Sequence, residues 1–293
     1  MASTFDTFLQ QAWTDHADES EAVALRLRTQ TPAPATADQL SALARLVVHL
    51  CGEHLGAFDD GRWRLRALAN HPLADAGVQS ALRVGIASLT LAQTGRADLT
   101  GFTLEEEVRS EAAAAAISLG RHQTERAMAL LRGARERLVD LPRVGAAVHR
   151  PLAVACNNMA WELHDRGSAR SAGDTAAMFD LAAASRAHWA QAGTWLEVER
   201  GDYALAMCHL SAGLNDQALQ FAAQCLAACT QNDAPAYEFF FAHEAIARAQ
   251  HARVDAVART RNVACAQAAF QRLPVSDQDA CRATLTALHA LAR

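Results

Sequence analysis

The stretch at residues 194–229 constrains the fold of this chain more than any other, because it has the features of two antiparallel helices joined by a short turn. Thr194 and Glu197 form a Thr-x-x-Glu capping box, in which each side chain takes up a backbone N–H left unpaired at the start of a helix. Gly213 can adopt the positive φ that ends a helix, and the Asn-Asp pair at 215–216 can start the next one. The second helix then presents small side chains on one face, namely Ala218, Ala222 and Cys225.

Composition extends this prediction to the whole chain. About a quarter of the residues are alanine, the strongest helix former, whereas there are only 7 prolines, 15 glycines and 2 tyrosines. Much of the 51% hydrophobic fraction is therefore alanine, which suits close stacking of helices. We predict an all-α fold.

Charge and cysteine content bear on the class of protein. A formal charge of −5, without clustered basic residues, argues against a nucleic-acid partner. The seven cysteines form no CxxC pair and lie within helical patterns, as expected of reduced thiols that pack as small hydrophobic groups. The chain begins without a basic and apolar leader and contains no run of 18 apolar residues. We expect a cytoplasmic protein with no membrane span.

Helix start and stop signals recur along the chain. Thr-x-x-Gln at 36–39 and Thr-x-x-Glu at 103–106 predict helix starts, and Asp174 is a predicted N-cap. Predicted helix stops at Gly120, Gly167 and Gly213 are 46–47 residues apart, with an earlier stop at Gly56. We divide the chain into an N-terminal helical pair and linker (1–35), degenerate repeats (36–275) and a C-terminal capping helix (276–293); one continuous solenoid is the alternative.

The pattern resembles a degenerate tetratricopeptide repeat. Counted back from Gly167, the packing positions of that repeat are filled by Cys156, Met159, Ala160 and Leu163. Phrases such as NNMAWELHD and AGTWLEVERGDYALAM also resemble bacterial tetratricopeptide-like proteins over residues 100–270. The resemblance implies an α-α superhelix, a right-handed solenoid of antiparallel helix pairs. Asp202 departs from it, because a carboxylate stands where the family packs an aromatic ring; either the register differs or Asp202 pairs with Arg200 or an arginine of the preceding unit.

The same resemblance implies where a ligand would bind, since the first helix of each pair lines the concave groove of such arrays. The residues projected onto that groove combine aromatic surface with amides and a few charges, as peptide and small-ligand sites do. They are Asn157, Asn158, Trp161, His164, Arg200, Tyr203, Met207, Phe241, Glu244 and Arg248. Some family members clamp a carboxylate terminus, but Ser110 and Ala114 stand where two of the clamp residues would be, so we do not predict that specificity.

Catalysis and metal binding have weaker sequence support. Cys208, His209, Cys225, Cys229 and His243 are metal-ligand types without compact ligand spacing, and the first reading of Cys225 and Cys229 is helix packing. Glu197, Glu199, Asp202, Glu238 and Glu244 could do acid-base work only if the fold brings them together. No GxGxxG, P-loop, HExxH or GxSxG motif occurs. We predict no catalytic residue, no cofactor and no metal.

Three functional hypotheses follow. The first is a non-enzymatic binding or scaffold protein that recognises a peptide or protein partner in the groove, with Trp161 in the groove and the other tryptophans, Trp13, Trp63, Trp189 and Trp195, in packing roles. The alternative is a helical-repeat enzyme or small-molecule sensor whose pocket is lined by Trp, Glu, His and Arg. The third is a homodimer formed through the alanine-rich convex surface or the N-terminal helices.

Overall fold

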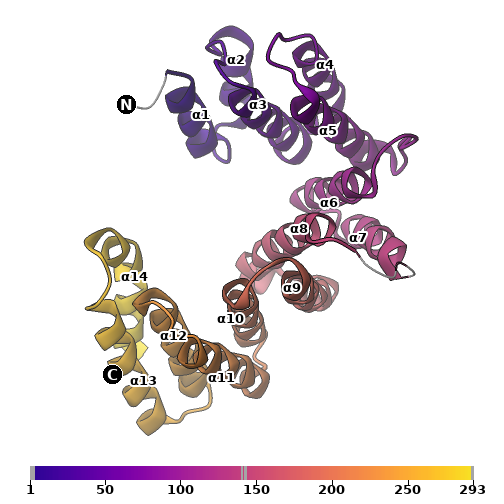
Figure 1. Cartoon of the computed structure of the whole chain (residues 1–293). Helices are drawn as coiled ribbons and strands as arrows, with labels where there is room; N and C mark the ends of the chain where they lie inside the picture. Colours follow the sequence, from indigo (N-terminus) through magenta and orange to yellow (C-terminus); the bar gives the residue numbers. More distant parts are fainter. Residues whose placement is uncertain (1–3, 140, 142–143, 292–293) are drawn as a thin grey trace. The chain divides into compact units, whose positions relative to one another are not determined.

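The computed structural model describes residues 4–139, 141 and 144–291, and over these residues the protein is all-α, with 14 α-helices and no strand (Figure 1). The chain divides into an N-terminal unit (residues 1–155) and a C-terminal unit (156–293). The N-terminal unit contains α1 Thr4–Asp15, α2 Ser20–Thr29, α3 Ala37–His49, α4 Phe58–Leu68, α5 Ala76–Thr94, α6 Leu104–Gly120 and α7 Thr124–Val139. Helix α8, Ala146–Asp165, runs across the division.

The N-terminal unit has two adjoining cores. In the first, α5 packs on α3, α4 and α6, with apolar side chains such as Leu40, Leu65, Leu89 and Ile117 fully or almost fully buried. In the second, α1 and α2 pack on the neighbouring face of α3 through Phe5, Val23 and Leu46. Helix α3 continues into a π-helical turn, η1 Leu50–His54, which the sequence analysis did not foresee.

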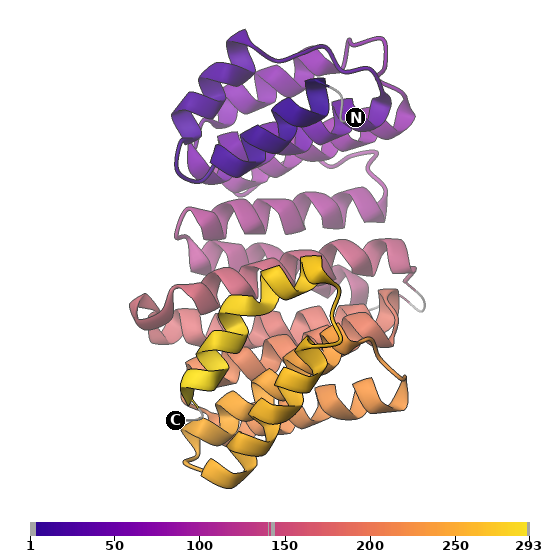
Figure 2. The same ribbon diagram turned by 90° about the vertical axis from the view of Figure 1, so that its left-hand side faces the viewer.

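The C-terminal unit is built from helices that pack mainly on their neighbours in sequence. It contains α9 Ala172–Ala192, α10 Trp195–Ser211, α11 Asn215–Gln231, α12 Ala236–Ala252, α13 Ala256–Phe270 and α14 Val275–Leu291, with a 3-10 turn at η2 Gly167–Ala169. Each of α10 to α13 packs on the helix before it, and α14 packs on both α12 and α13 at the end of the unit (Figure 2). The seam between α10, α11 and α12 is made by Ala206, Ala222 and Ala245, all fully buried. Small side chains let the helix backbones approach closely, as the sequence predicted.

Most predicted helix starts are confirmed. Thr103 with Glu106 and Thr194 with Glu197 form complete capping boxes. Thr36 caps α3 by accepting a hydrogen bond from the backbone of Gln39. The prediction that Asp174 is an N-cap is wrong. Ser171 is the N-cap of α9, and Asp174, three residues later, is the acidic partner of its capping box.

The predicted helix stops are mostly correct. Gly56, Gly167 and Gly213 all have positive φ, between 52° and 76°. Gly120 is the last residue of α6, so this helix ends where predicted, although the positive φ of 60° falls on His122.

The anomalous carboxylate of Asp202 is explained by a buried ion pair. Asp202 is 3% exposed and receives two hydrogen bonds from Arg186 of α9, one from Nε at 2.5 Å and one from Nη2 at 3.2 Å. The neighbouring Gly201 allows this approach, since a Cβ at residue 201 would lie 2.9 Å from the Cβ of Arg186. Of the two predicted partners, an arginine of the preceding unit is the correct one.

No helix among the described residues has both the length and the apolar character that crossing a bilayer requires.

Candidate functional site

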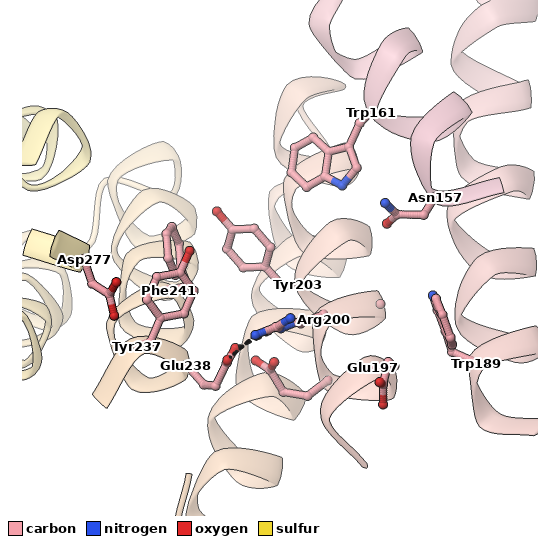
Figure 3. A pocket seen from close by; sticks show the side chains of 12 residues that line it. Asn157, Trp161, Trp189, Glu197, Arg200, Tyr203, Tyr237, Glu238, Phe241 and Asp277 are labelled. Atoms are coloured by element: carbon pink, nitrogen blue, oxygen red, sulfur yellow. Dashed lines mark hydrogen bonds and ion pairs between the residues drawn. The ribbon is translucent and has the colours of Figure 1, made fainter. Parts of the chain in front are cut away.

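An open cleft of about 730 Å³ lies within the C-terminal unit (Figure 3). Its walls come from α8, α9, α10, α12 and α14. Helical spacing explains the convergence, because residues three or four apart share one helix face, as do Asn157 and Trp161 on α8. The lining comprises Asn157, Trp161, Trp189, Glu197, Glu199, Arg200, Gly201, Tyr203, Tyr237, Glu238, Phe241 and Asp277.

A row of aromatic rings runs along the cleft. The ring of Trp161 lies 6.1 Å from that of Tyr203, which lies 5.6 Å from Phe241, and Phe241 lies 4.9 Å from Tyr237. These separations are typical of interacting aromatic pairs. The row is continuous over three helices, α8, α10 and α12, and Figure 3 shows the side chains of Trp161, Tyr203 and Phe241 next to one another.

A hydrogen bond to a buried carboxylate fixes the ring of Tyr203 within this row. The hydroxyl of Tyr203 donates a hydrogen bond of 2.9 Å to Glu244, whose other carboxylate oxygen accepts one of 2.8 Å from Arg248. Glu244 is 3% exposed and lies outside the lining. Burial, followed by the charge of Glu244, raises the pKa of Tyr203, so this hydroxyl stays protonated and fixes its ring.

An ion pair between two lining residues joins α10 to α12. Arg200 of α10 donates to both carboxylate oxygens of Glu238 on α12, at 2.6 Å and 3.4 Å. Glu238 is buried, whereas the side chain of Arg200 is 56% exposed. The hydrogen bond to Glu238 is the main reason that the pKa of Arg200 is raised. Arg200 is therefore already committed to a carboxylate of its own chain (Figure 3).

Glu199 is a buried acid beside this pair. It is 2% exposed, and burial, followed by repulsion from Glu238, raises its pKa to about 7. The thiol of Cys229 lies 3.8 Å from Oε1, while Oε2 is buried without a hydrogen-bond partner among the described residues. Near neutral pH this carboxyl group is thus partly protonated, because a charged carboxylate with so few hydrogen bonds is poorly stabilised.

The structure brings together half of the predicted site residues. Asn157, Trp161, Arg200, Tyr203 and Phe241 line the cleft, and the other five are not among its lining residues. Asn158 is exposed, and His164 contacts the ring of Trp161 edge-on. Met207 packs in the apolar seam between α10, α11 and α12. Glu244 and Arg248 form an ion pair that also holds the hydroxyl of Tyr203.

Several lining residues were not predicted from the sequence. Trp189, expected to be a packing residue, lines the cleft, as do Tyr237 and Asp277. The expectation of packing is also wrong for Trp63, which is 66% exposed. Trp13 is 37% exposed, but it does pack between helices, with its ring 5.1 Å from that of His49 on α3. Tyr237 could have been found, since it lies four residues before Phe241 and so on the same helix face.

The cysteines considered as metal ligands are buried within helix contacts instead. Cys208, Cys225 and Cys229 are fully buried, and burial raises the pKa of each thiol, to about 12 for Cys208 and Cys229. Metal binding requires the thiolate, which burial disfavours here. Within the part of the chain that the structure describes, these cysteines, His209 and His243 form no cluster of three metal-ligand atoms.

No protein-family model, curated protein or solved structure matches this chain. The fold and the cleft alone define the class, which is an all-α protein of successive packed helices with an aromatic cleft in its C-terminal unit.

Proposed function

We propose that this protein is a non-enzymatic binding module, in which the cleft of the C-terminal unit recognises a basic segment of a peptide or protein partner. The observation that carries the proposal is the row of four aromatic rings, Trp161, Tyr203, Phe241 and Tyr237, in a cleft rich in carboxyl groups. As part of the same proposal, the helix pairs belong to a tetratricopeptide-like right-handed solenoid, and the protein works in the cytoplasm.

Charge favours a cationic occupant. Among the described residues that line the cleft, four carry carboxyl groups and one carries a guanidinium group. The guanidinium of Arg200 is neutralised by Glu238, while Asp277 faces the cleft from α14. The cleft therefore has an acidic excess, which attracts basic ligands and repels acidic ones.

The aromatic rings favour the same occupant. An arginine or lysine side chain placed over an aromatic face gains about 0.5–1 kcal/mol in exposed sites and about 2 kcal/mol when desolvated. Arginine fits best, because its planar guanidinium can stack on a ring and donate hydrogen bonds to carboxylates at its edge. Asn157 supplies an amide beside the rings for a main-chain group of the ligand.

Selection from a random peptide library tests the proposal without assuming a ligand. Purified protein is panned against displayed 12-residue peptides, in parallel with the double variant Trp161→Ala/Phe241→Ala. We expect wild-type protein to enrich peptides with arginine or lysine next to an apolar residue, and the variant to lose that enrichment. The matched control is Trp63→Ala, which removes an exposed tryptophan from the N-terminal unit. Enrichment of acidic peptides, or equal enrichment by the double variant, would contradict the proposal.

One observation supports a second candidate, a small-molecule sensor or enzyme. Glu199 lines the cleft with a pKa raised to about 7, the range in which a carboxyl group can both accept and donate a proton. The histidine expected in such a pocket is not among the described lining residues. A thermal-shift screen with small amines decides between the two candidates. A small amine that stabilises wild-type protein but not Glu199→Gln would favour the sensor or enzyme.

A further inference from the structure

Three histidines converge in the N-terminal unit, far along the sequence from the cleft residues. His16 follows α1, His49 is the last residue of α3, and His54 is the last residue of the π-helical turn η1. One ring nitrogen of each lies within 4.8 Å of the others. The Nε2 atoms of His49 and His54 are 3.1 Å apart. From this convergence we propose a binding site for a divalent transition metal, of which zinc is the best fit.

The distances suit a shared metal ion. Zinc binds histidine nitrogens at about 2.0–2.1 Å in tetrahedral geometry, which places two ligand nitrogens about 3.3 Å apart. The Nε2 atoms of His49 and His54, 3.1 Å apart, are already close to this separation, and a ring nitrogen of His16 lies within 4.8 Å of a ring nitrogen of each. Three neutral imidazoles suit zinc, copper and nickel better than magnesium or calcium, which prefer oxygen ligands.

Hydrogen bonds at Nδ1 orient two of the rings for metal binding through Nε2. Nδ1 of His49 lies 2.8 Å from a carboxylate oxygen of Glu53, and Nδ1 of His16 lies 2.6 Å from the backbone oxygen of Trp13. A proton on each Nδ1 directs the lone pair of Nε2 to the metal; at His49 the metal would take the place of the Nε2 proton of His54, 3.1 Å away. Carboxylate and carbonyl partners of this kind are the usual outer shell of histidine ligands.

The π-helical turn is what brings His54 next to His49. In a π-helix the hydrogen bond joins residues five apart, and these two histidines have that spacing. The turn is held against α6 at Gly52, where a Cβ would lie 2.8 Å from the side chain of Ile117. Single π-helical turns inside α-helices are often found at functional sites.

The surroundings also limit solvent access to the cluster. All three histidines are partly buried, and the ring of Trp13 lies 5.1 Å from His49 and 5.2 Å from His16, where it covers one side of the cluster. Three protein ligands leave a fourth tetrahedral position for water or another ligand.

Zinc titration of full-length protein without a histidine tag tests the site. After removal of metals with EDTA, calorimetry should give one Zn²⁺ per chain, and Co²⁺ should give the visible absorption of a tetrahedral site. We expect His49→Gln and His54→Gln to weaken binding at least about 100-fold, and Glu53→Ala, which removes only the hydrogen-bond partner of His49, about 10- to 100-fold. Zinc should also raise the Tm of wild-type protein, because the ion would join α1 to α3 and η1.

The control is His289→Gln, which removes an exposed histidine from α14 and should leave zinc affinity unchanged. His16→Gln provides a variant outside the π-helical turn if the other two fail to fold by circular dichroism. Wild-type protein that binds no zinc at micromolar concentration would overturn the proposal. So would a folded His16→Gln protein that binds zinc as tightly as wild type.

Discussion

Replacement of the buried acid Glu199 by glutamine should stabilise the protein at high pH and have little effect at low pH. The pKa of Glu199 is raised from 4.5 to about 7 in the folded protein, mainly by burial. Between these two values the folded protein holds a proton that the unfolded chain has released, so the free energy of unfolding falls as pH rises through this window. At about 1.4 kcal/mol per pKa unit, the full cost above pH 7 is about 3 kcal/mol.

Glutamine has almost the same shape as the protonated acid and carries no charge at any pH. The measurement is urea unfolding of wild-type protein and Glu199→Gln at pH 5 and pH 8, at equal ionic strength. We expect the variant to be more stable by up to about 3 kcal/mol at pH 8, with most of that gain absent at pH 5. Glu105→Gln, a partly exposed position on α6, is the control and should change stability little at either pH. A variant that is less stable than wild type at pH 8, or whose gain does not depend on pH, would refute the reasoning.

Three further predictions concern stability, each measured by chemical unfolding. Asp202→Ala should lower the free energy of unfolding by about 3 kcal/mol, because it leaves Arg186 without its partner. The loss is not larger, since the partly exposed guanidinium can regain water. A loss below about 1 kcal/mol would contradict this prediction. Gly201→Ala should cost about 1–3 kcal/mol through overpacking against Arg186. An unchanged free energy of unfolding would show that α9 and α10 can separate without cost. Thr103→Ala should cost about 1 kcal/mol by removing the hydroxyl that caps α6, and a neutral result would mean that the carboxylate of Glu106 suffices.

Features that depend on residues close in sequence could be predicted. The capping boxes at Thr103 and Thr194 need only a side chain and a backbone N–H three residues apart, so the sequence pattern contains the whole interaction. The buried face formed by Ala127, Leu131 and Ala134 on α7 follows from helical spacing in the same way. The all-α fold rests on many such local signals, which explains why it could be inferred without a related structure.

Features that depend on neighbouring helices could be predicted only in part. The sequence indicated that Asp202 needs a cationic partner, but only the packing of α9 on α10 identifies Arg186. Arg200 was expected to face a ligand in the groove, yet the packing of α12 beside α10 supplies a carboxylate partner from the same chain, Glu238. Trp189 was assigned to packing because the direction of a side chain from a long helix depends on the register of its neighbours.

The histidine cluster shows a different limit of sequence analysis. His49 and His54 are five residues apart, a spacing that places them on different faces of an α-helix, so no α-helical pattern would pair them. The π-helical turn at residues 50–54 changes that geometry, and α1 then brings His16 from 33 residues upstream of His49. Neither the turn nor the approach of α1 has a local sequence signal.

The central claim, that the aromatic and acidic cleft binds a basic segment, is tested most directly by a matched pair of peptides. One hexapeptide carries a central arginine, and the other carries citrulline, which has nearly the same shape without the charge. Binding is followed by the fluorescence of Trp161 and Trp189 at low salt. We predict that the arginine peptide binds at least about tenfold more tightly, a difference of about 1.4 kcal/mol, and that Trp161→Ala/Phe241→Ala abolishes this preference. Equal affinity of wild-type protein for the two peptides would contradict the account.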